Sequence, residues 1–248
     1  MGPLLEDYRV LELLYSSSRS VVVRAQRASD GRNVILKQPA AGLPENLARS
    51  RFSHEVAMRA GLDARWVVQI LEHQDLRLVL EDLDGRSLQQ FLGRSNLALE
   101  PALELACGLT RALSSVHQAG ILHGDVHPGN FIYHEATGCL KISDFDLALR
   151  LESAGQVADS MIQGSLAYLS PERTGRLNAA IGFPSDLYSL GVTLYQLFSG
   201  RLPFESDDPL RLVHSHLALE PDAIHTIPSV ISRIIRRLLR KDPSKRYQ

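Results

Sequence analysis

The spacing of apolar residues changes along the chain, from short runs near the start to helical repeats further on. Short apolar runs at residues 21–25, 33–37 and 76–80 have the length of strands and predict an early sheet. Residues 45–60 differ, because their apolar side chains recur at helical spacing and form a stripe. The first third of the chain is therefore predicted to be a small sheet accompanied by one helix.

Helical spacing dominates the rest of the chain. Residues 99–119 carry apolar side chains at intervals of three and four. Residues 184–200 begin with Pro, end with Gly and contain little charge, so this helix is expected to be buried nearly all round. Two apolar runs, at residues 131–133 and 140–142, flank a turn and predict a hairpin. The acidic stretch at residues 81–85 is the predicted boundary between the two parts.

Composition sets limits on the class of protein. A chain of 248 residues with 44% hydrophobic content can bury one large core or two smaller ones, and its net charge of −1 gives no footprint for nucleic acid. Cys107 and Cys139 are too few for a disulfide scaffold and indicate a reducing compartment such as the cytoplasm; both are expected to be small buried side chains. No apolar run approaches the roughly 18 residues of a membrane helix, so no membrane segment is expected.

The most specific chemical signal is His-Gly-Asp-Val-His-Pro-Gly-Asn at residues 123–130, followed by Asp-Phe-Asp at residues 144–146. Asp125, Asn130 and Asp144 have the spacing of the catalytic and metal-binding residues in a phosphoryl-transfer site. A hydroxyl that attacks a γ-phosphate needs a carboxylate to orient it and accept its proton, and divalent cations to neutralise the phosphates. A lone Asp in a turn is more often a cap, so the inference depends on the spacing.

A lysine and a glutamate upstream suit the same chemistry. Lys37 ends the apolar run at residues 33–37, which resembles the Val-Ala-Ile-Lys strand of kinases, and the resemblance implies that Lys37 reaches the α- and β-phosphates. Glu55 borders the apolar stripe of the helix at residues 45–60. A carboxylate there is costly unless it is paired, and Lys37 is the natural partner.

These motifs occur in the order and at the intervals of the protein kinases, and the chain resembles that superfamily over nearly its whole length. The resemblance implies an α+β, two-lobed protein-kinase-like fold. It implies a small β-rich N-lobe at about residues 1–82, a hinge at about 81–85 and a larger, mainly helical C-lobe at about 86–248. It also implies ATP and Mg²⁺ as cofactors, with Mn²⁺ as an alternative metal.

The resemblance also assigns roles to individual residues. Asp125 and the Lys37–Glu55 pair would be catalytic, and Asn130 and Asp144 would hold the metal. Glu81 and Leu83 would offer backbone hydrogen bonds to adenine. The full set of implied nucleotide contacts is Ser17, Ser20, Val22, Ile35, Lys37, Glu81 and Leu83.

The later part of the chain resembles the structural framework of the same superfamily. Residues 164–172 are similar to the end of an activation segment, with Ser170-Pro171-Glu172 in place of Ala-Pro-Glu. By this resemblance, Glu172 would pair with Arg246, and Asp186 would tie the catalytic loop to the helix at residues 184–200.

A narrower resemblance concerns residues 168–176, 185–195 and 212–216. They are similar to the serine/threonine-kinase-like domain at the N-terminus of bacterial multi-sensor hybrid histidine kinases. This implies a protein substrate or a regulatory partner, and further ATPase, sensor and histidine kinase domains in the same protein. The chain stops where kinases usually continue into a final helix, so we expect a fragment of a longer protein.

Several positions depart from the kinase pattern. Serines in place of glycines weaken the phosphate-covering loop, and loss of the catalytic-loop Arg removes the group that reads a phosphorylated activation segment. His127 stands where the kinases have Lys, and with it the loop resembles that of aminoglycoside and choline phosphotransferases. The second Asp of Asp-Phe-Asp, Asp146, is either a turn residue or an inward carboxylate that strengthens metal binding. The positions are Tyr15, Ser17, Ser20, Gly124, His127 and Asp146.

Three functions are therefore considered. The intact polar set favours a serine/threonine protein kinase in signal transduction. The departures favour a nucleotide-binding or inactive pseudokinase module of a larger sensor kinase. His127 alone favours a small-molecule phosphotransferase. A zinc site at His123 and His127 is not expected, because Pro128-Gly129 prevents a regular helix between them.

Overall fold

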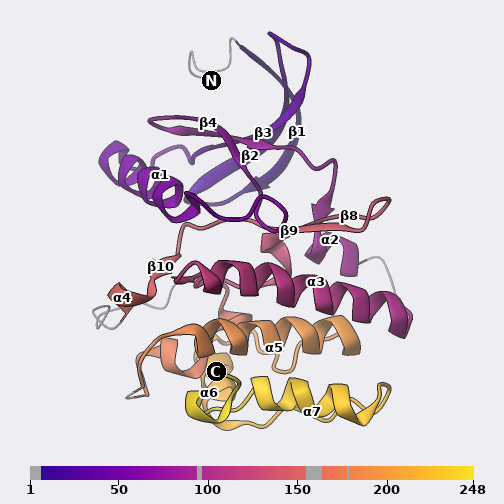
Figure 1. Cartoon of the computed structure of the whole chain (residues 1–248). Coiled ribbons are helices and arrows are strands. Elements are labelled where there is room, and N and C mark those ends of the chain that lie inside the picture. The colour runs from indigo at the N-terminus through magenta and orange to yellow at the C-terminus, as the bar shows by residue number, and fades with distance from the viewer. Residues whose placement is uncertain (1–6, 94–96, 155–163, 178) are drawn as a thin grey trace.

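The N-lobe is a five-stranded antiparallel sheet with one helix beside it (Figure 1). The computed structural model describes residues 7–93, 97–154, 164–177 and 179–248. The strand order of the sheet is β1-β2-β3-β5-β4. Its elements are β1 (Tyr8–Ser16), β2 (Ser20–Arg27), β3 (Asn33–Pro39), α1 (Glu45–Arg59), β4 (Ile70–Gln74) and β5 (Arg77–Glu81).

Alternation along β3 directs its side chains to two different cores. Val34 and Leu36 belong to one apolar cluster with Tyr8, Ala25 and Val79. A second cluster contains Phe52 of α1, Val68, Leu78 and Leu80, and it fixes the helix against the sheet. Because successive residues of a strand point to opposite faces, Lys37 faces the α1 side. The sheet therefore delivers this lysine to the helix that carries Glu55.

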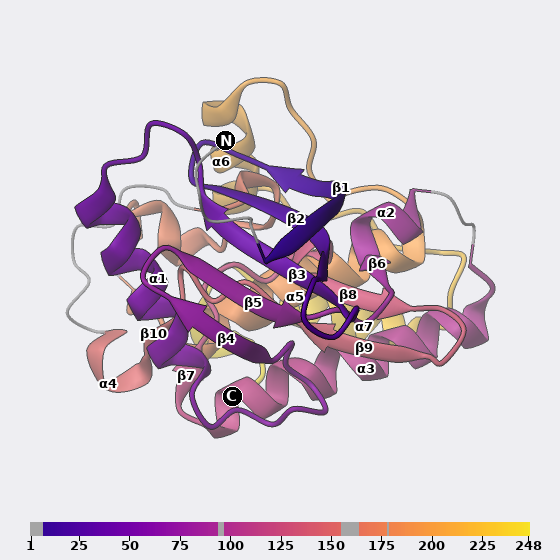
Figure 2. The same ribbon diagram turned by 90° about the horizontal axis from the view of Figure 1, so that it is seen from above.

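The C-lobe is mainly helical and lies below the N-lobe in Figure 1. Helices α3, α5 and α7 follow one another downwards there, and Figure 2 shows from above that the N-lobe sheet lies over them. The helices are α2 (Leu88–Leu92), α3 (Leu99–Gln118), α4 (Leu151–Ala154), α5 (Phe183–Ser199), α6 (Pro209–Ala218) and α7 (Ser229–Leu238). The short strands are β6 (Arg86–Ser87), β7 (Ile121–Leu122), β8 (Phe131–His134), β9 (Cys139–Ile142) and β10 (Leu149–Arg150).

Helix α5 forms the centre of the C-lobe. Pro184 lies in its first turn, and Gly200 ends it in the left-handed conformation with φ of 73°. Between these ends the helix is buried on most sides, and Tyr188 and Tyr195 are among the largest fully buried side chains. A helix with so little charge would expose apolar side chains to water anywhere but in the middle of the lobe.

Residues 82–85 connect the two lobes, between β5 and β6. The guanidinium of Arg24 on β2 donates to Asp82 at 2.7 Å and 3.3 Å and to the carbonyl oxygen of Gly85 at 3.2 Å. At the end of β5, the Glu81 carboxylate accepts from Lys141 of β9 at 2.7 Å. These contacts fix the connection to both lobes, so the lobes are positioned relative to each other at the site between them.

The elements predicted from periodicity are present, with ends that differ by one or two residues. The expected burial of the cysteines is wrong for Cys107, whose residue is exposed, and Cys139 is half-buried; both are free thiols. Cys107 lies on the exposed side of α3. Within the described residues, no helix has both the length and the apolar character needed to cross a membrane.

Candidate active site

Lys37 is the centre of a buried charge network between the lobes. Its ammonium nitrogen lies 2.7 Å from Glu55 Oε2 and 2.8 Å from Asp144 Oδ1, and the residue is 6% exposed. Burial alone lowers the pKa of Lys37, but the charges of Asp144 and Glu55 outweigh it and hold the pKa above its usual value. The lysine therefore stays charged, as a phosphate ligand must.

Glu55 has two cationic partners, which offsets the cost of its burial. Its second oxygen accepts from Arg59 Nη1 at 2.9 Å, one turn further along α1. Arg59 also donates to the carbonyl oxygen of Val68. Buried charges are tolerated when each is paired and hydrogen-bonded, and this network satisfies that condition. The predicted pairing of Lys37 with Glu55 is present in the structure.

Asp186 holds the backbone of the catalytic loop. Its carboxylate accepts from the His123 amide at 2.7 Å, from the Gly124 amide at 2.9 Å and from His117 Nε2 at 2.9 Å. Burial raises the pKa of Asp186, but the hydrogen bond and charge of His117 outweigh it, so the pKa lies below its usual value. The tie between this loop and α5, implied by the resemblance, is present.

Gly124 occupies a position that no other residue fits. Its φ is 79°, and a Cβ atom there would clash with the carbonyl oxygen of Leu147. Its own carbonyl oxygen accepts from the guanidinium of Arg173. In this packing of the catalytic loop against residue 147, glycine is the residue that fits. Sequence reasoning gave no role to Arg173.

Asp125 is held from three sides. Ser165 donates its amide to Oδ1 at 3.1 Å, Asn130 Nδ2 lies 3.4 Å from Oδ2, and His127 Nε2 also lies 3.4 Å from Oδ2. His127 Nδ1 accepts from the Gly129 amide, which assigns the ring proton to Nε2, facing Asp125. Burial raises the pKa of Asp125, but the hydrogen bond from His127 leads the effects that bring it below its usual value. The carboxylate is therefore ionised.

Asp144 and Asn130 are oxygen donors that suit a hard divalent cation. Asp144 adopts a φ of 60°, a left-handed conformation that Asp tolerates, and the charge and hydrogen bond of Lys37 outweigh burial to lower its pKa. Asn130 Nδ2 donates to the carbonyl oxygen of Asp125 at 2.8 Å, so the side-chain oxygen is the atom that Asn130 could offer to a metal. A magnesium ion takes one or two protein oxygens, with phosphates and waters completing its shell, and these two residues fit it.

Asp146 has a partner that the sequence did not reveal. Its Oδ2 accepts from the guanidinium of Arg51, one turn before Glu55 on α1. The two expectations for Asp146, a passive turn residue or a free carboxylate beside the metal, are both incomplete, because neither includes this cation. Arg51 gave no sequence signal, since a charged residue on a helix is ordinarily solvated.

The phosphate-covering loop closes over a small cavity of about 70 Å³. Ser17 donates its amide and its hydroxyl to the Ser20 carbonyl oxygen, and its hydroxyl accepts from the amides of Arg19 and Ser20. These groups are thereby engaged within the loop. The cavity is lined by Tyr15, Ser17, Arg19, Ser20, Asp125, Asp144, Asp146 and Leu147.

Apolar side chains of the predicted nucleotide set lie at the end of the site nearest the hinge. Ile35 and Leu83 pack on one cluster, and Ile132 of β8 joins them. Val22 lies opposite Lys37 on β2. Ile132 was missed, although its place in the β8 strand two residues after Asn130 could have indicated it. The Glu81 side chain has a structural role, since it accepts from Lys141 and from the Gln69 amide at 2.8 Å.

A β-rich lobe, a helical lobe and a buried lysine that bridges Glu55 and Asp144 between them define a protein-kinase-like fold. The comparison with known families agrees. The chain belongs to the protein kinase domain family, whose pattern it matches over residues 8–248.

Individual relatives are serine/threonine-protein kinases by name. A probable serine/threonine-protein kinase of Clostridium perfringens is 30% identical over 260 residues, covering 100% of this chain and 37% of that protein. Pkn2 of Myxococcus xanthus is 32% identical, and the match covers 97% of this chain and 31% of Pkn2. PknA of Mycobacterium tuberculosis is 30% identical, and the match covers 97% of this chain and 58% of PknA. The chain thus spans less than two thirds of the length of these relatives.

Proposed function

We propose that this chain is an ATP-dependent protein kinase that transfers the γ-phosphoryl group to Ser or Thr hydroxyls of a protein. The observation that carries the proposal is the position of Lys37, buried between Glu55 and Asp144 and kept charged by them. The relatives, which are named serine/threonine-protein kinases, support the choice of acceptor.

Each polar residue of the site has a role in this reaction. Asp125 is ionised and orients the attacking hydroxyl, whose proton it accepts. His127 donates to Asp125 and fixes the direction of its carboxylate. Asn130 and Asp144 are the proposed ligands of Mg²⁺, with Mn²⁺ as an alternative, and the bound metal neutralises phosphate charge. Lys37 contacts the α- and β-phosphates.

The adenine site follows from the same geometry. Ile35, Leu83 and Ile132 supply apolar contacts, Val22 lies above the lysine, and the backbone of Glu81 and Leu83 offers hydrogen bonds to the base. Ser17 and Ser20 line the phosphate end of the cavity. Their donors engage phosphate once the internal bonds of the loop open.

The proposal extends to the surroundings of the domain. A protein substrate or a regulatory partner is expected, and the relatives are longer than this chain, which agrees with further ATPase, sensor or histidine kinase domains in the same protein. Two free thiols and the need for ATP are consistent with the cytoplasm.

A second candidate is a regulatory pseudokinase module. The observation in its favour is the phosphate-covering loop, in which the Ser17 amide and hydroxyl already donate to the Ser20 carbonyl oxygen. In this candidate the loop stays closed and the fold serves as a docking module for a partner. Transfer of the γ-phosphate separates the two candidates, because the regulatory module transfers none whether or not it binds nucleotide.

The direct test is transfer of labelled γ-phosphate, with protein acceptors and small hydroxyl compounds assayed side by side in Mg²⁺ and in Mn²⁺. Label on Ser or Thr of a protein supports the kinase. Label confined to aminoglycosides or choline-like alcohols supports the small-molecule alternative that His127 suggests. Nucleotide binding without transfer supports the regulatory module.

We expect the variant Lys37→Met to lose most of the thermal stabilisation that Mg²⁺-ATP gives the parent protein. A ligand at about a hundred times its Kd stabilises the native state by about 2.7 kcal/mol. For a domain of this size that corresponds to a rise in Tm of roughly 5 °C or more. Differential scanning fluorimetry with and without Mg²⁺-ATP measures the shift.

Lys245→Met is the matched control, because Lys245 is exposed and forms a surface ion pair with Asp242 at 3.7 Å. This control should keep the full shift. Absence of a shift in the parent protein at millimolar Mg²⁺-ATP contradicts nucleotide binding and leaves the docking module.

A further inference from the structure

Three contacts join helix α1 to the segment that follows β9. Glu55 is linked through Lys37 to Asp144. Arg51 forms an ion pair with Asp146, and His54 Nε2 lies 2.7 Å from the carbonyl oxygen of Ala148. The helix and the metal-binding loop are therefore connected at every second residue of the loop, from 144 to 148.

The two ion pairs act in parallel. Arg51 and Glu55 are one turn apart and lie on the same side of α1. Asp144 and Asp146 are two residues apart in the loop, and the Asp146 amide lies 3.4 Å from Asp144 Oδ1. A displacement of α1 that separates Arg51 from Asp146 would also draw Glu55 away from Lys37. The outer pair thus constrains the inner one.

Asp146 is the carboxylate that pairs directly with Arg51. The side chains of Arg51 and Asp146 are only 22% and 17% exposed, so solvent screens their attraction less than it screens a surface pair. Burial and the nearby Arg19 guanidinium lower the pKa of Arg51, and the more distant charges of Asp144 and Glu55 oppose this only in part. Without the Asp146 carboxylate, Arg51 would lose its direct partner and would still face the like charge of Arg19.

We propose that the Arg51–Asp146 ion pair is a positioning device that holds α1 against the metal-binding loop, so that Glu55 reaches Lys37 before nucleotide binds. The kinase pattern has Gly where this chain has Asp146, so the device depends on a departure from that pattern. Its importance for phosphoryl transfer rests on the proposed function. The effect of the ion pair on the position of α1 does not depend on the proposed function.

The test is hydrogen exchange of the amides of α1 in protein treated with a phosphatase and kept free of nucleotide. Arg51→Met and Asp146→Asn should each speed exchange at the Glu55 end of α1 by about tenfold. Because both remove the same interaction, the double variant should exchange no faster than either single variant. Amides of α5 report global stability and should not change.

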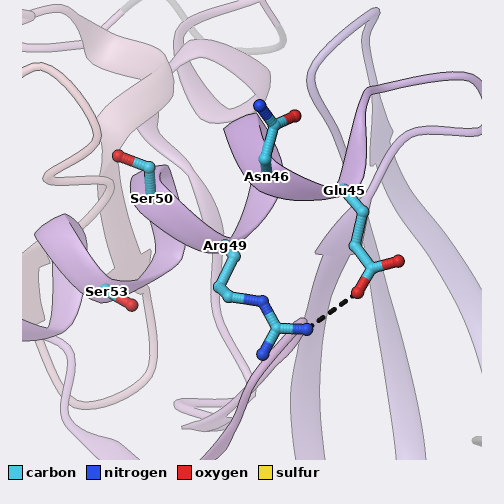
Figure 3. Close-up of a pocket in the computed structure, with 5 residues that line it drawn as sticks. All are labelled: Glu45, Asn46, Arg49, Ser50 and Ser53. Carbon is cyan, nitrogen blue, oxygen red and sulfur yellow. Dashed lines mark hydrogen bonds and ion pairs between the residues drawn. The ribbon is translucent and has the colours of Figure 1, made fainter.

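Arg49→Met is the matched control on the same helix. Arg49 pairs with Glu45, as Figure 3 shows, and with Asp75, on the exposed side of α1 beside a shallow surface depression. Its loss removes an arginine and two ion pairs from α1 but none of the contacts with the loop. Exchange at the Glu55 end should stay as in the parent protein.

The inference is overturned if exchange at α1 is unchanged in Arg51→Met and Asp146→Asn, if the two effects add in the double variant, or if Arg49→Met has the same effect. The Kd for Mg²⁺-ATP, measured in the same variants, separates this inference from the proposed function. Faster exchange in a protein whose parent form binds no nucleotide supports the ion pair and contradicts the kinase. Nucleotide binding by the parent protein, with unchanged exchange in the variants, agrees with the kinase and contradicts the role given to the ion pair.

Discussion

The variant Asp125→Asn should lose phosphoryl transfer by about two to four orders of magnitude while it still binds Mg²⁺-ATP. The amide has the same shape as the carboxylate but a single acceptor oxygen, so it keeps the contact from either Ser165 or Asn130, which donate to different oxygens of Asp125. The amide cannot accept the proton of the attacking hydroxyl group. Because the amide carries no negative charge, it also no longer orients that hydroxyl group. The expected loss is therefore in the rate constant kcat rather than in nucleotide affinity.

The measurement is transfer of labelled phosphate to a protein acceptor, together with the thermal shift by Mg²⁺-ATP. Asp222→Asn provides the control, because Asp222 is an exposed aspartate of the C-lobe, far along the chain from the site, and forms a surface ion pair with Arg201 at 3.1 Å. It should transfer at the parent rate. Transfer undiminished in Asp125→Asn would refute the role given to this residue.

Much of the fold could be predicted because its elements have strong periodicity. An apolar stripe, as at residues 45–60, must pack against another element, and the structure has α1 on the sheet. A helix that is apolar on most sides, as at residues 184–200, must be surrounded by other elements, and the structure has α5 in the centre of the C-lobe. The ends of these helices differ by one or two residues, because caps and packing rather than periodicity decide where a helix stops.

The polar residues of the site could be placed because the cost of burying charge limits their partners. Glu55 on a buried face required a cation, and the structure supplies Lys37 and also Arg59. Arg51 could not be found in this way. It lies on a helix face that the sequence describes as solvated, and only the fold shows that the metal-binding loop covers it.

Departures from a family pattern were the hardest residues to interpret from sequence. Gly124 suggested the loss of a regulatory charge, and the structure adds that a side chain there would clash with the backbone of Leu147. Asp146 suggested either a turn residue or an inward carboxylate beside the metal, and the structure adds an ion pair with the Arg51 guanidinium. In both cases the decisive contact comes from a residue with no motif of its own, so spacing carried no information about it.

The variant Arg246→Met should destabilise the whole domain by roughly 3–5 kcal/mol, the cost of leaving one partner of a buried ion pair uncompensated. Arg246 is 1% exposed and forms a two-pronged pair with Glu172, at 2.6 Å and 2.8 Å. It also donates to the carbonyl oxygens of Pro184, Arg240 and Lys241, at 2.7, 2.7 and 3.0 Å. Methionine fills much of the volume but satisfies none of these acceptors.

The effect should reach the active site, because these acceptors lie on segments that support it. Pro184 begins α5, whose Asp186 holds the catalytic loop, and Glu172 follows the segment that donates the Ser165 amide to Asp125. We therefore expect a fall in Tm of about 10 °C and a lower temperature at which nucleotide binding is lost. Arg246→Lys should recover only part of the stability, since an ammonium cannot form the fork.

Thermal unfolding followed by circular dichroism measures this change, and Arg201→Met is the reference for an arginine in an exposed pair. Exposed pairs contribute about 0–1 kcal/mol, so the reference should lose no more than about 3 °C. Equal losses in Arg246→Met and Arg201→Met would contradict the structural role of the buried pair. A large loss in Arg246→Met alone would show that the framework of the C-lobe depends on the contact between Glu172 and Arg246, which are 74 positions apart in the chain.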